Sequence, residues 1–174
     1  MGLLKFFLVA LFVFLISNEI QEETILWEKQ KRLSWSDFKG KPQNNRAAAV
    51  TASGLTYRIA TTKENNKVVA VDFEVNSFFY PQKSWFRPAL CDQVILSHEQ
   101  LHFDITEVYA EILRKRFAKA LQTHKSQAEM KAIYQQVNRE LNDFQNVYDA
   151  ETNFSRNREQ QLLWNKKIEA ILMD

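Results

Sequence analysis

The segment from Ala89 to Leu121 restricts the fold more than any other part of the chain. It contains neither Gly nor Pro, and its apolar side chains recur every three or four residues, which predicts one long helix. Ser126 and Glu129 form a capping-box pair that predicts the start of a second helix. The apolar positions of this second segment step by four and three as far as Tyr148, and a last, short helix is predicted over residues 159–173.

Shorter, β-like patterns precede these helices. The segments 47–61 and 67–80 contain stretches in which apolar and polar side chains alternate, and residues 63–67 (KENNK) have the composition of a turn, so the two segments predict a hairpin. Residues 84–88 end this pattern with Pro88. The sequence therefore predicts an α+β fold in which N-terminal antiparallel strands are followed by two long packed helices and a short C-terminal helix.

The first residues have a different character. Lys5 precedes an unbroken apolar run from Phe6 to Ile16, and polar residues follow, which is the layout of a secretory signal peptide. The run is much shorter than the roughly 20 residues of a membrane-spanning helix. We expect residues 1–18 to be a signal peptide, with an uncleaved anchor as the alternative, and residues 19–174 to form one secreted or periplasmic domain. We expect membrane association only through this export signal.

Composition excludes several kinds of function. Lys and Arg number 23 and Asp and Glu 21, and the formal net charge of +2 is too small for an electrostatic footprint on nucleic acid, so no nucleic-acid partner is expected. The single Cys, Cys91, cannot form an internal disulfide or a Cys-x-x-Cys site, and we expect it to be a small buried apolar residue. A metal site would have to use His and carboxylate side chains.

The first predicted helix contains the motif His-Glu-x-x-His. Its two imidazoles, His98 and His102, lie about 40° apart on one helical face and can bind the same zinc ion (Zn2+). They share this side with apolar residues such as Leu101 and Ile105, so both should point into the domain. Glu99 could then act as the base for a zinc-bound water. The alternative is a pair of structural histidines that are satisfied by hydrogen bonds in the core.

A catalytic zinc ion usually has a third protein ligand. Continuing the apolar series of the second helix from Tyr148 by a step of three reaches Glu151, so we predict Glu151 as this ligand, with Asp149 as its competitor. An ordinary carboxylate at a helix end is the alternative for both. Tyr148 could donate a hydrogen bond to a developing oxyanion, although a core position is the simpler interpretation.

Other polar residues near the motif have plainer interpretations. Asp104 follows the motif directly and could orient a ligand from behind. Glu107 and Glu111 fall on the opposite side of the helix and predict a solvated acidic face. His124 lies in the polar segment between the two long helices, where we expect a surface residue.

Beyond the short motif, the chain resembles a bacterial family of unknown function that is commonly described as predicted secreted zinc-dependent proteases. The resemblance runs through most of the part after the signal. It is carried by Leu33-Ser-Trp-Ser-Asp-Phe-Lys-Gly40, Ala52–Tyr57, Ser84-Trp85, His98-Glu-Gln-Leu-His-Phe-Asp-Ile105 and Tyr148-Asp-Ala-Glu-Thr152 followed by Gln161 and Trp164.

This resemblance implies a zincin-like metallopeptidase fold and site, with His98 and His102 as zinc ligands, Glu99 as the base, and export from the cytoplasm. Members of the family often carry a His in the segment after Tyr-Asp-x-x-Thr, where this chain has Phe154. Because Phe154 cannot bind zinc, the chain would use Glu151 or Asp149 instead, bind metal weakly, or be a pseudoenzyme.

The leading hypothesis from the sequence is an exported zinc-dependent hydrolase, a metallopeptidase that acts on peptides or proteins. The alternative is a non-catalytic binding module of the cell envelope that retains the fold and uses its Trp-bearing β part to contact partners. The sequence indicates neither the substrate nor the oligomeric state.

Overall fold

The computed structural model describes residues 22–123 and 126–173. The predicted signal peptide and His124 lie outside these residues. Five strands precede three helices along the described chain: β1 (Ile25–Leu26), β2 (Ala49–Val50), β3 (Ser53–Glu64), β4 (Lys67–Phe79), β5 (Trp85–Phe86), α1 (Gln93–Gln122), α2 (Gln127–Thr152) and α3 (Arg158–Met173), with a 3-10 turn, η1 (Trp35–Asp37), after β1. The predicted α+β order of strands, two long helices and a short helix is confirmed.

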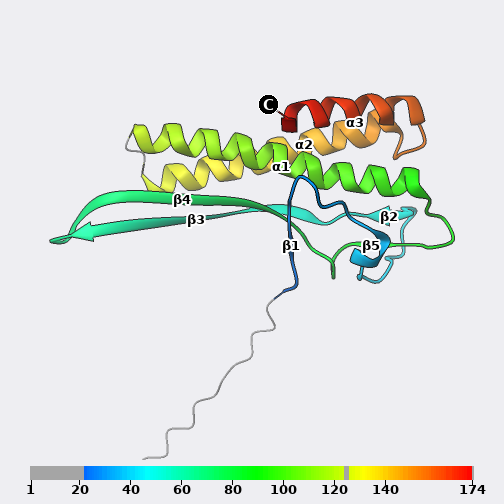
Figure 1. The fold of residues 1–174 in the computed structure, drawn as a ribbon, viewed down its shortest axis with the longest axis horizontal. Coiled ribbons are helices and arrows are strands. Elements are labelled where there is room, and N and C mark those ends of the chain that lie inside the picture. Colours follow the sequence, from blue (N-terminus) through cyan, green and yellow to red (C-terminus); the bar gives the residue numbers. More distant parts are fainter. Residues whose placement is uncertain (1–21, 124–125, 174) are drawn as a thin grey trace, which may run out of the picture.

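Strands β3 and β4 form the long hairpin that the sequence predicts. The hairpin turns at Asn65 and Asn66, which both adopt left-handed backbone conformations with φ of 49° and 62°, as two-residue hairpin loops require. β1 pairs with the other edge of β4, which gives a three-stranded antiparallel sheet in the order β1-β4-β3, while β2 and β5 form a separate pair. The hairpin extends beyond the helices (Figure 1).

The three helices lie together on one side of the hairpin, with α1 and α2 antiparallel (Figure 1). α1 contacts β3, β4, α2 and α3, so it is covered on most of its circumference and forms the centre of the molecule. It begins at Gln93 rather than at Ala89, because the Asp92 side chain caps it by accepting hydrogen bonds from Val94 N and Ile95 N. A core of aliphatic and aromatic residues joins α1 to the sheet and to the other two helices.

The predicted solvated acidic face of α1 is wrong for Glu107. Its side chain is buried, pairs with Arg114 Nη1 at 2.7 Å and accepts a hydrogen bond from Ser77 of β4. The reason is that the sheet covers the side of α1 opposite the histidines, which a single helical wheel cannot show. Glu111, one turn later, is only half-buried.

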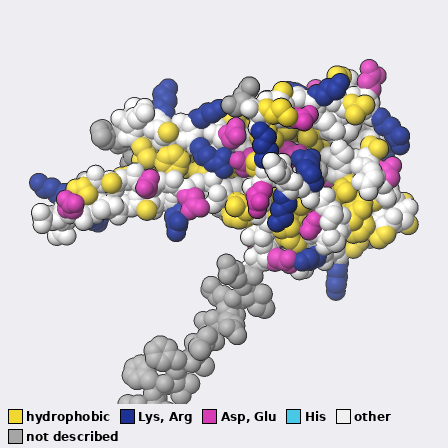
Figure 2. Space-filling model, in the orientation of Figure 1, with side chains coloured by type: hydrophobic (Ala, Val, Ile, Leu, Met, Phe, Trp, Pro, Cys, Tyr) yellow, Lys and Arg dark blue, Asp and Glu magenta, His cyan; other side chains and the backbone are white. Residues whose placement is uncertain are grey.

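The surface of the molecule is mixed in charge. On the face shown in Figure 2, Lys and Arg side chains are interspersed with Asp and Glu rather than gathered in one region. Within the described residues, no helix has the length and apolar character needed to cross a membrane.

Candidate metal site

The two motif histidines and one carboxylate converge between α1 and α2. His98 Nε2 and His102 Nε2 lie 3.3 Å apart, and Asp149 Oδ1 lies 3.1 Å from the first and 3.0 Å from the second. One ligand atom from each of the three residues falls within 4.8 Å of the others. His98 and His102 stand one turn apart on α1, and Asp149 lies in the last turn of α2, so the antiparallel packing of these helices creates the group.

The other nitrogen of each ring faces an amide oxygen. His98 Nδ1 lies 2.9 Å from Gln161 Oε1 of α3, and His102 Nδ1 lies 3.2 Å from Gln145 Oε1 of α2. An amide oxygen only accepts hydrogen bonds, so each Nδ1 carries the proton. The two Nε2 atoms then present lone pairs toward each other and toward the Asp149 carboxylate, an arrangement that a metal cation or added protons must neutralise.

The pKa values reflect this crowding of acceptors. Burial is the largest single influence and favours the neutral form of both His102 and Asp149. The hydrogen bonds and opposite charges between the imidazoles and the carboxylate together outweigh it, so the pKa of His102 is raised and the pKa of Asp149 is held far below its usual value. The charge of Glu99 also raises the pKa of His102. Two neutral imidazoles and one ionised carboxylate form a suitable donor set for a divalent ion such as zinc.

Glu99 provides an independent sign that the group is incomplete. Its side chain is 5% exposed, and Oε2 is buried without a hydrogen-bond partner among the described residues. A buried carboxylate oxygen without a partner is costly. Burial chiefly raises the pKa of Cys91, and the charge of Glu99 raises it further. Cys91, which we expected to be buried, is half-buried, and its thiol donates to Ala48 O.

Glu151, which we predicted as the third ligand, does not join the two histidines. Its carboxylate accepts a hydrogen bond from Trp164 Nε1 at 2.8 Å, and the competitor, Asp149, occupies the predicted place. The two positions differ by about 200° around a helix. The buried stripe of α2 continues from Tyr148 by a step of four to Thr152, which is fully buried, whereas the prediction assumed a step of three.

Tyr148 forms a wall of the site. Its ring stacks on His98 with centroids 4.6 Å apart, and its hydroxyl donates to His98 O at 3.2 Å and accepts from Gln161 Nε2 at 2.8 Å. Burial raises the pKa of Tyr148 far above its usual value. The predicted role as an oxyanion donor does not fit a hydroxyl that is fully buried and occupied within the chain.

Asp104 holds the N-terminal segment onto α1 and does not bond to either imidazole. It is buried, accepts hydrogen bonds from Trp27 Nε1 and Gln100 Nε2, both at 2.9 Å, and pairs with Arg32 at 3.0 Å. Gln100 in turn accepts a hydrogen bond from Leu33 N. Gln100, in the middle of the motif, and Asp104, just after it, therefore anchor residues 27–33 to α1.

Phe154 stands outside the group. Its side chain is 59% exposed, and it lies in a left-handed run with Asn153 and Ser155 that ends α2. Phe154, where the resemblance implies a His, is thus not part of the group formed by His98, His102 and Asp149.

Sequence reasoning missed the roles of Gln145 and Gln161. Gln145 could have been found, because it precedes Asp149 by four residues and so shares its helical face. Gln161 was visible only as part of the family resemblance, since the packing of α3 on α1 cannot be read from local sequence.

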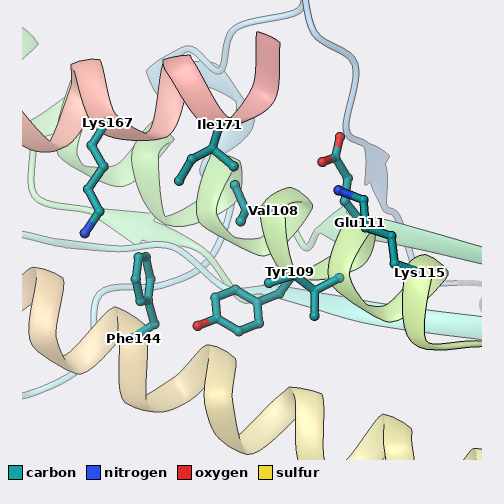
Figure 3. Close-up of a pocket in the computed structure, with 8 residues that line it drawn as sticks. Val108, Tyr109, Glu111, Lys115, Phe144, Lys167 and Ile171 are labelled. Atoms are coloured by element: carbon teal, nitrogen blue, oxygen red, sulfur yellow. The ribbon is translucent and has the colours of Figure 1, made fainter. Parts of the chain in front are cut away.

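A separate pocket lies along the helices away from the motif. It has a volume of about 370 Å³ and is lined by residues from all three helices, including Tyr109, Phe144 and Lys167 (Figure 3). Lys167 Nζ lies 5.1 Å from the centre of the Phe144 ring and 4.2 Å from that of Trp164, so its charge is directed at aromatic rings. None of the three candidate metal ligands, His98, His102 and Asp149, lines this pocket.

Comparison with known families agrees with the resemblance that the motifs suggest. Residues 27–156 match the family described as bacterial protein of unknown function (DUF922). The chain belongs to this family. Comparison with curated proteins and with solved structures gave no match. The matched segment contains His98, His102, Asp149 and Glu99, and it ends before Gln161.

Proposed function

We propose that this protein is an exported zinc-dependent hydrolase, a metallopeptidase with a zincin-like site. The observation that carries the proposal is the convergence of His98, His102 and Asp149 within 4.8 Å, beside a buried Glu99 oxygen that has no partner among the described residues. Either feature alone occurs in structural sites. Together they supply a metal-binding group and a base in adjacent positions.

The donor set favours zinc over other metals. Two imidazole nitrogens and one carboxylate oxygen are the protein ligands of a known class of catalytic zinc sites, which leave a coordination position open. Zinc bound here would polarise a carbonyl group and lower the pKa of a coordinated water to about 7. In a purely structural site, we would expect both oxygens of a buried Glu99 to have hydrogen-bond partners. Oε2 has none among the described residues.

Glu99 is the proposed catalytic base. It follows His98 directly on α1, is held in a low-dielectric environment by burial, and keeps one oxygen free of protein hydrogen bonds. That oxygen can accept the proton of the attacking water and pass it to the leaving amine. Asp149 and the two imidazoles would hold the metal, while Tyr148 supports His98 from behind.

The edge of β2 favours an extended peptide as the substrate. Val50 pairs with Trp85, and Arg87 N donates to Ala48 O at 2.8 Å, so the backbone groups of the intervening Ala49, and of Thr51, point away from β5. No strand within the described residues pairs with this outer edge of β2. Ala49 is buried and Thr51 is half-buried, so an extended peptide would form main-chain hydrogen bonds with this edge chiefly at Thr51.

This edge lies close to the motif. The Thr51 hydroxyl donates to Glu99 O at 3.0 Å, and β2 lies near the first turns of α1 (Figure 1). A peptide that extended β2 would therefore pass near Glu99. In the proposed peptidase, the base Glu99 would therefore lie beside the bound substrate.

The competing proposal, a non-catalytic envelope module, gains little from the structure. It would use the Trp-bearing β part to contact partners, but Trp85 is buried, Trp27 bonds to Asp104 and Trp35 stacks on Phe86 with centroids 4.6 Å apart. These side chains are used within the domain. Export itself rests on residues 1–18 and is independent of which activity is correct.

The test begins with zinc content and continues with turnover. The exported protein, purified without chelator, should contain about one zinc ion per chain, and the double variant His98→Ala, His102→Ala should contain none. Glu99→Gln should keep its zinc and lose at least about a hundredfold in the hydrolysis of a mixed peptide library. A protein that binds no zinc would contradict the proposal. Zinc binding with no cleavage, or with cleavage that Glu99→Gln does not change, would favour the non-catalytic module.

A further inference from the structure

The glutamines behind the two histidines are held in one orientation by their surroundings. Gln161 Nε2 donates to Asn165 Oδ1 at 2.8 Å, and Asn165 Nδ2 donates to Ser97 Oγ at 3.0 Å. This chain of bonds runs from α3 to the residue before the motif. It directs the Gln161 amide nitrogen away from His98, so that the amide oxygen faces His98 Nδ1.

Gln145 is fixed in the same sense by different partners. Its Nε2 lies 3.2 Å from Thr106 Oγ1 and 3.3 Å from His102 O, so it donates to α1. The Thr106 hydroxyl donates to His102 O at 2.9 Å, which leaves its oxygen free to accept from Gln145. The Gln145 amide oxygen is thereby directed at His102 Nδ1.

We propose that Gln161 and Gln145 are positioning residues that hold His98 and His102 in the Nδ1–H tautomer, with both Nε2 lone pairs directed at one cation. The inference rests on the proposed function, because it assumes that a metal ion binds between the imidazoles and Asp149. Hydrogen-bond acceptors behind ligating histidines commonly fix the ring and its tautomer. Here the acceptors at Nδ1 are neutral amides. Among the described residues, Asp149 is the only anionic group within hydrogen-bond distance of both Nε2 atoms.

The inference also assigns a function to α3. Gln161 lies beyond residue 156, where the family match ends, and it is 2% exposed. The last helix would therefore complete the metal site from outside residues 27–156, the segment that matches the family model. Its role is to orient His98 rather than to bind the metal.

The experiment compares Zn2+ affinity, measured by competition with a chromophoric chelator, across four variants of the full exported chain. Gln161→Met and Gln145→Met keep side-chain length but remove the acceptor, and each should weaken affinity about 10–100-fold. Gln161→Glu keeps an acceptor facing Nδ1 and should stay within about threefold of the unchanged protein. Gln160→Met, on the neighbouring half-buried position of α3, should bind like the unchanged protein.

Nuclear magnetic resonance of the zinc-loaded proteins supplies a readout that packing alone would not change. The unchanged protein should show two hydrogen-bonded imidazole Nδ1–H protons, and each Met variant should lose the protection of one of them. Should Gln161→Met fail to fold, Gln145→Met carries the test, because Gln145 is only half-buried.

The outcomes separate this inference from the proposed function. If the unchanged protein binds zinc and both Met variants bind it equally tightly with both Nδ1–H signals intact, the positioning role is overturned while the metal site stands. If the unchanged protein binds no zinc, both proposals are overturned. Loss of affinity in the Met variants with retention in Gln161→Glu supports the positioning role.

Discussion

Two consecutive stretches of α1 bury carboxylates in different ways. Asp104 and Glu107, which we call the closed stretch, both have hydrogen-bond and ion-pair partners. Asp104 bonds to Trp27, Gln100 and Arg32, and Glu107 bonds to Ser77 and Arg114. In the preceding turn, Glu99 keeps a buried oxygen without a partner among the described residues, and Asp149 of α2 faces two imidazole nitrogens. Glu99 is buried as deeply as Asp104 and Glu107, whereas Asp149 is partly exposed. Only the group of Glu99 and Asp149 leaves acceptors unbalanced.

The comparison teaches that burial alone does not indicate function in this helix. A buried carboxylate with a full set of donors stabilises the fold, because its desolvation is offset by charge-assisted hydrogen bonds. A buried group of acceptors without enough donors costs free energy in the metal-free protein and is repaid when a cation binds. The two stretches should therefore respond oppositely to substitution, which the following predictions test.

The largest expected effect is the loss of zinc affinity in Asp149→Asn. One of three ligands loses its charge, which should cost about 4 kcal/mol, a fraction of the roughly 10–16 kcal/mol typical of bound zinc, or about a thousandfold in affinity. Competition titration with Zn2+ measures it. Asp143→Asn, on an exposed position of the same helix, is the matched control and should bind zinc unchanged. Equal affinities in the two variants would remove Asp149 from the site.

The next largest expected effect is a loss in the free energy of unfolding when Glu107, in the closed stretch, is replaced. Glu107→Ala leaves Arg114 without its carboxylate partner beside the sheet, and we expect a loss of about 3 kcal/mol in the free energy of unfolding. Urea denaturation measures it, and zinc affinity should not change. Glu111→Ala, one turn later on a half-buried position, should change stability by less than about 0.5 kcal/mol. Similar losses in both variants would show that the Glu107 network contributes nothing specific.

The sequence predicted the parts of the site that depend on local spacing. His98, Glu99 and His102 lie within one turn of an uninterrupted amphipathic segment, so their shared face follows from helical periodicity alone. The hairpin and the capped start of α2 were equally local, because Asn65-Asn66 and Ser126-Glu129 carry their own turn and cap chemistry.

The rest depended on packing between elements. Choosing correctly between Asp149 and Glu151 required knowledge of which face of α2 is buried near its end. A change of one residue in the assumed step moves the chosen side chain by about 100° around the helix. Glu107 seemed exposed because a helical wheel does not include the sheet that covers it. Gln161 reaches His98 only because α3 packs back on α1, a contact between residues 63 positions apart.

A smaller effect, of opposite sign, is expected at Glu99. Replacing it with Met removes a buried carboxylate oxygen that lacks a partner, so the metal-free protein should gain about 1 kcal/mol of stability while losing hydrolytic activity. Urea denaturation at pH 8 with chelator present measures the gain, and Glu107→Ala serves as the contrasting variant. A loss of stability in Glu99→Met would mean that this carboxylate is satisfied within the fold, and the difference between the two stretches would disappear.

The smallest expected effects are the separate contributions of Trp27 and Arg32, two partners of Asp104, to the free energy of unfolding. Trp27→Phe keeps the aromatic packing but removes the indole N–H that donates to Asp104 at 2.9 Å, and should cost about 1 kcal/mol. Arg32→Ala removes an ion pair whose Arg side chain is 57% exposed, and solvent screening should limit its cost to about 0.5 kcal/mol or less. Chemical denaturation of both variants in 0.1 M and 1 M salt separates the two contributions, because only the ion pair should weaken with salt. If Arg32→Ala proved the more destabilising, Asp104 would depend on the positive charge of Arg32 rather than on its buried hydrogen-bond donors. It would then resemble the acceptors of the metal site, which need a cation, and the contrast between the two stretches would weaken.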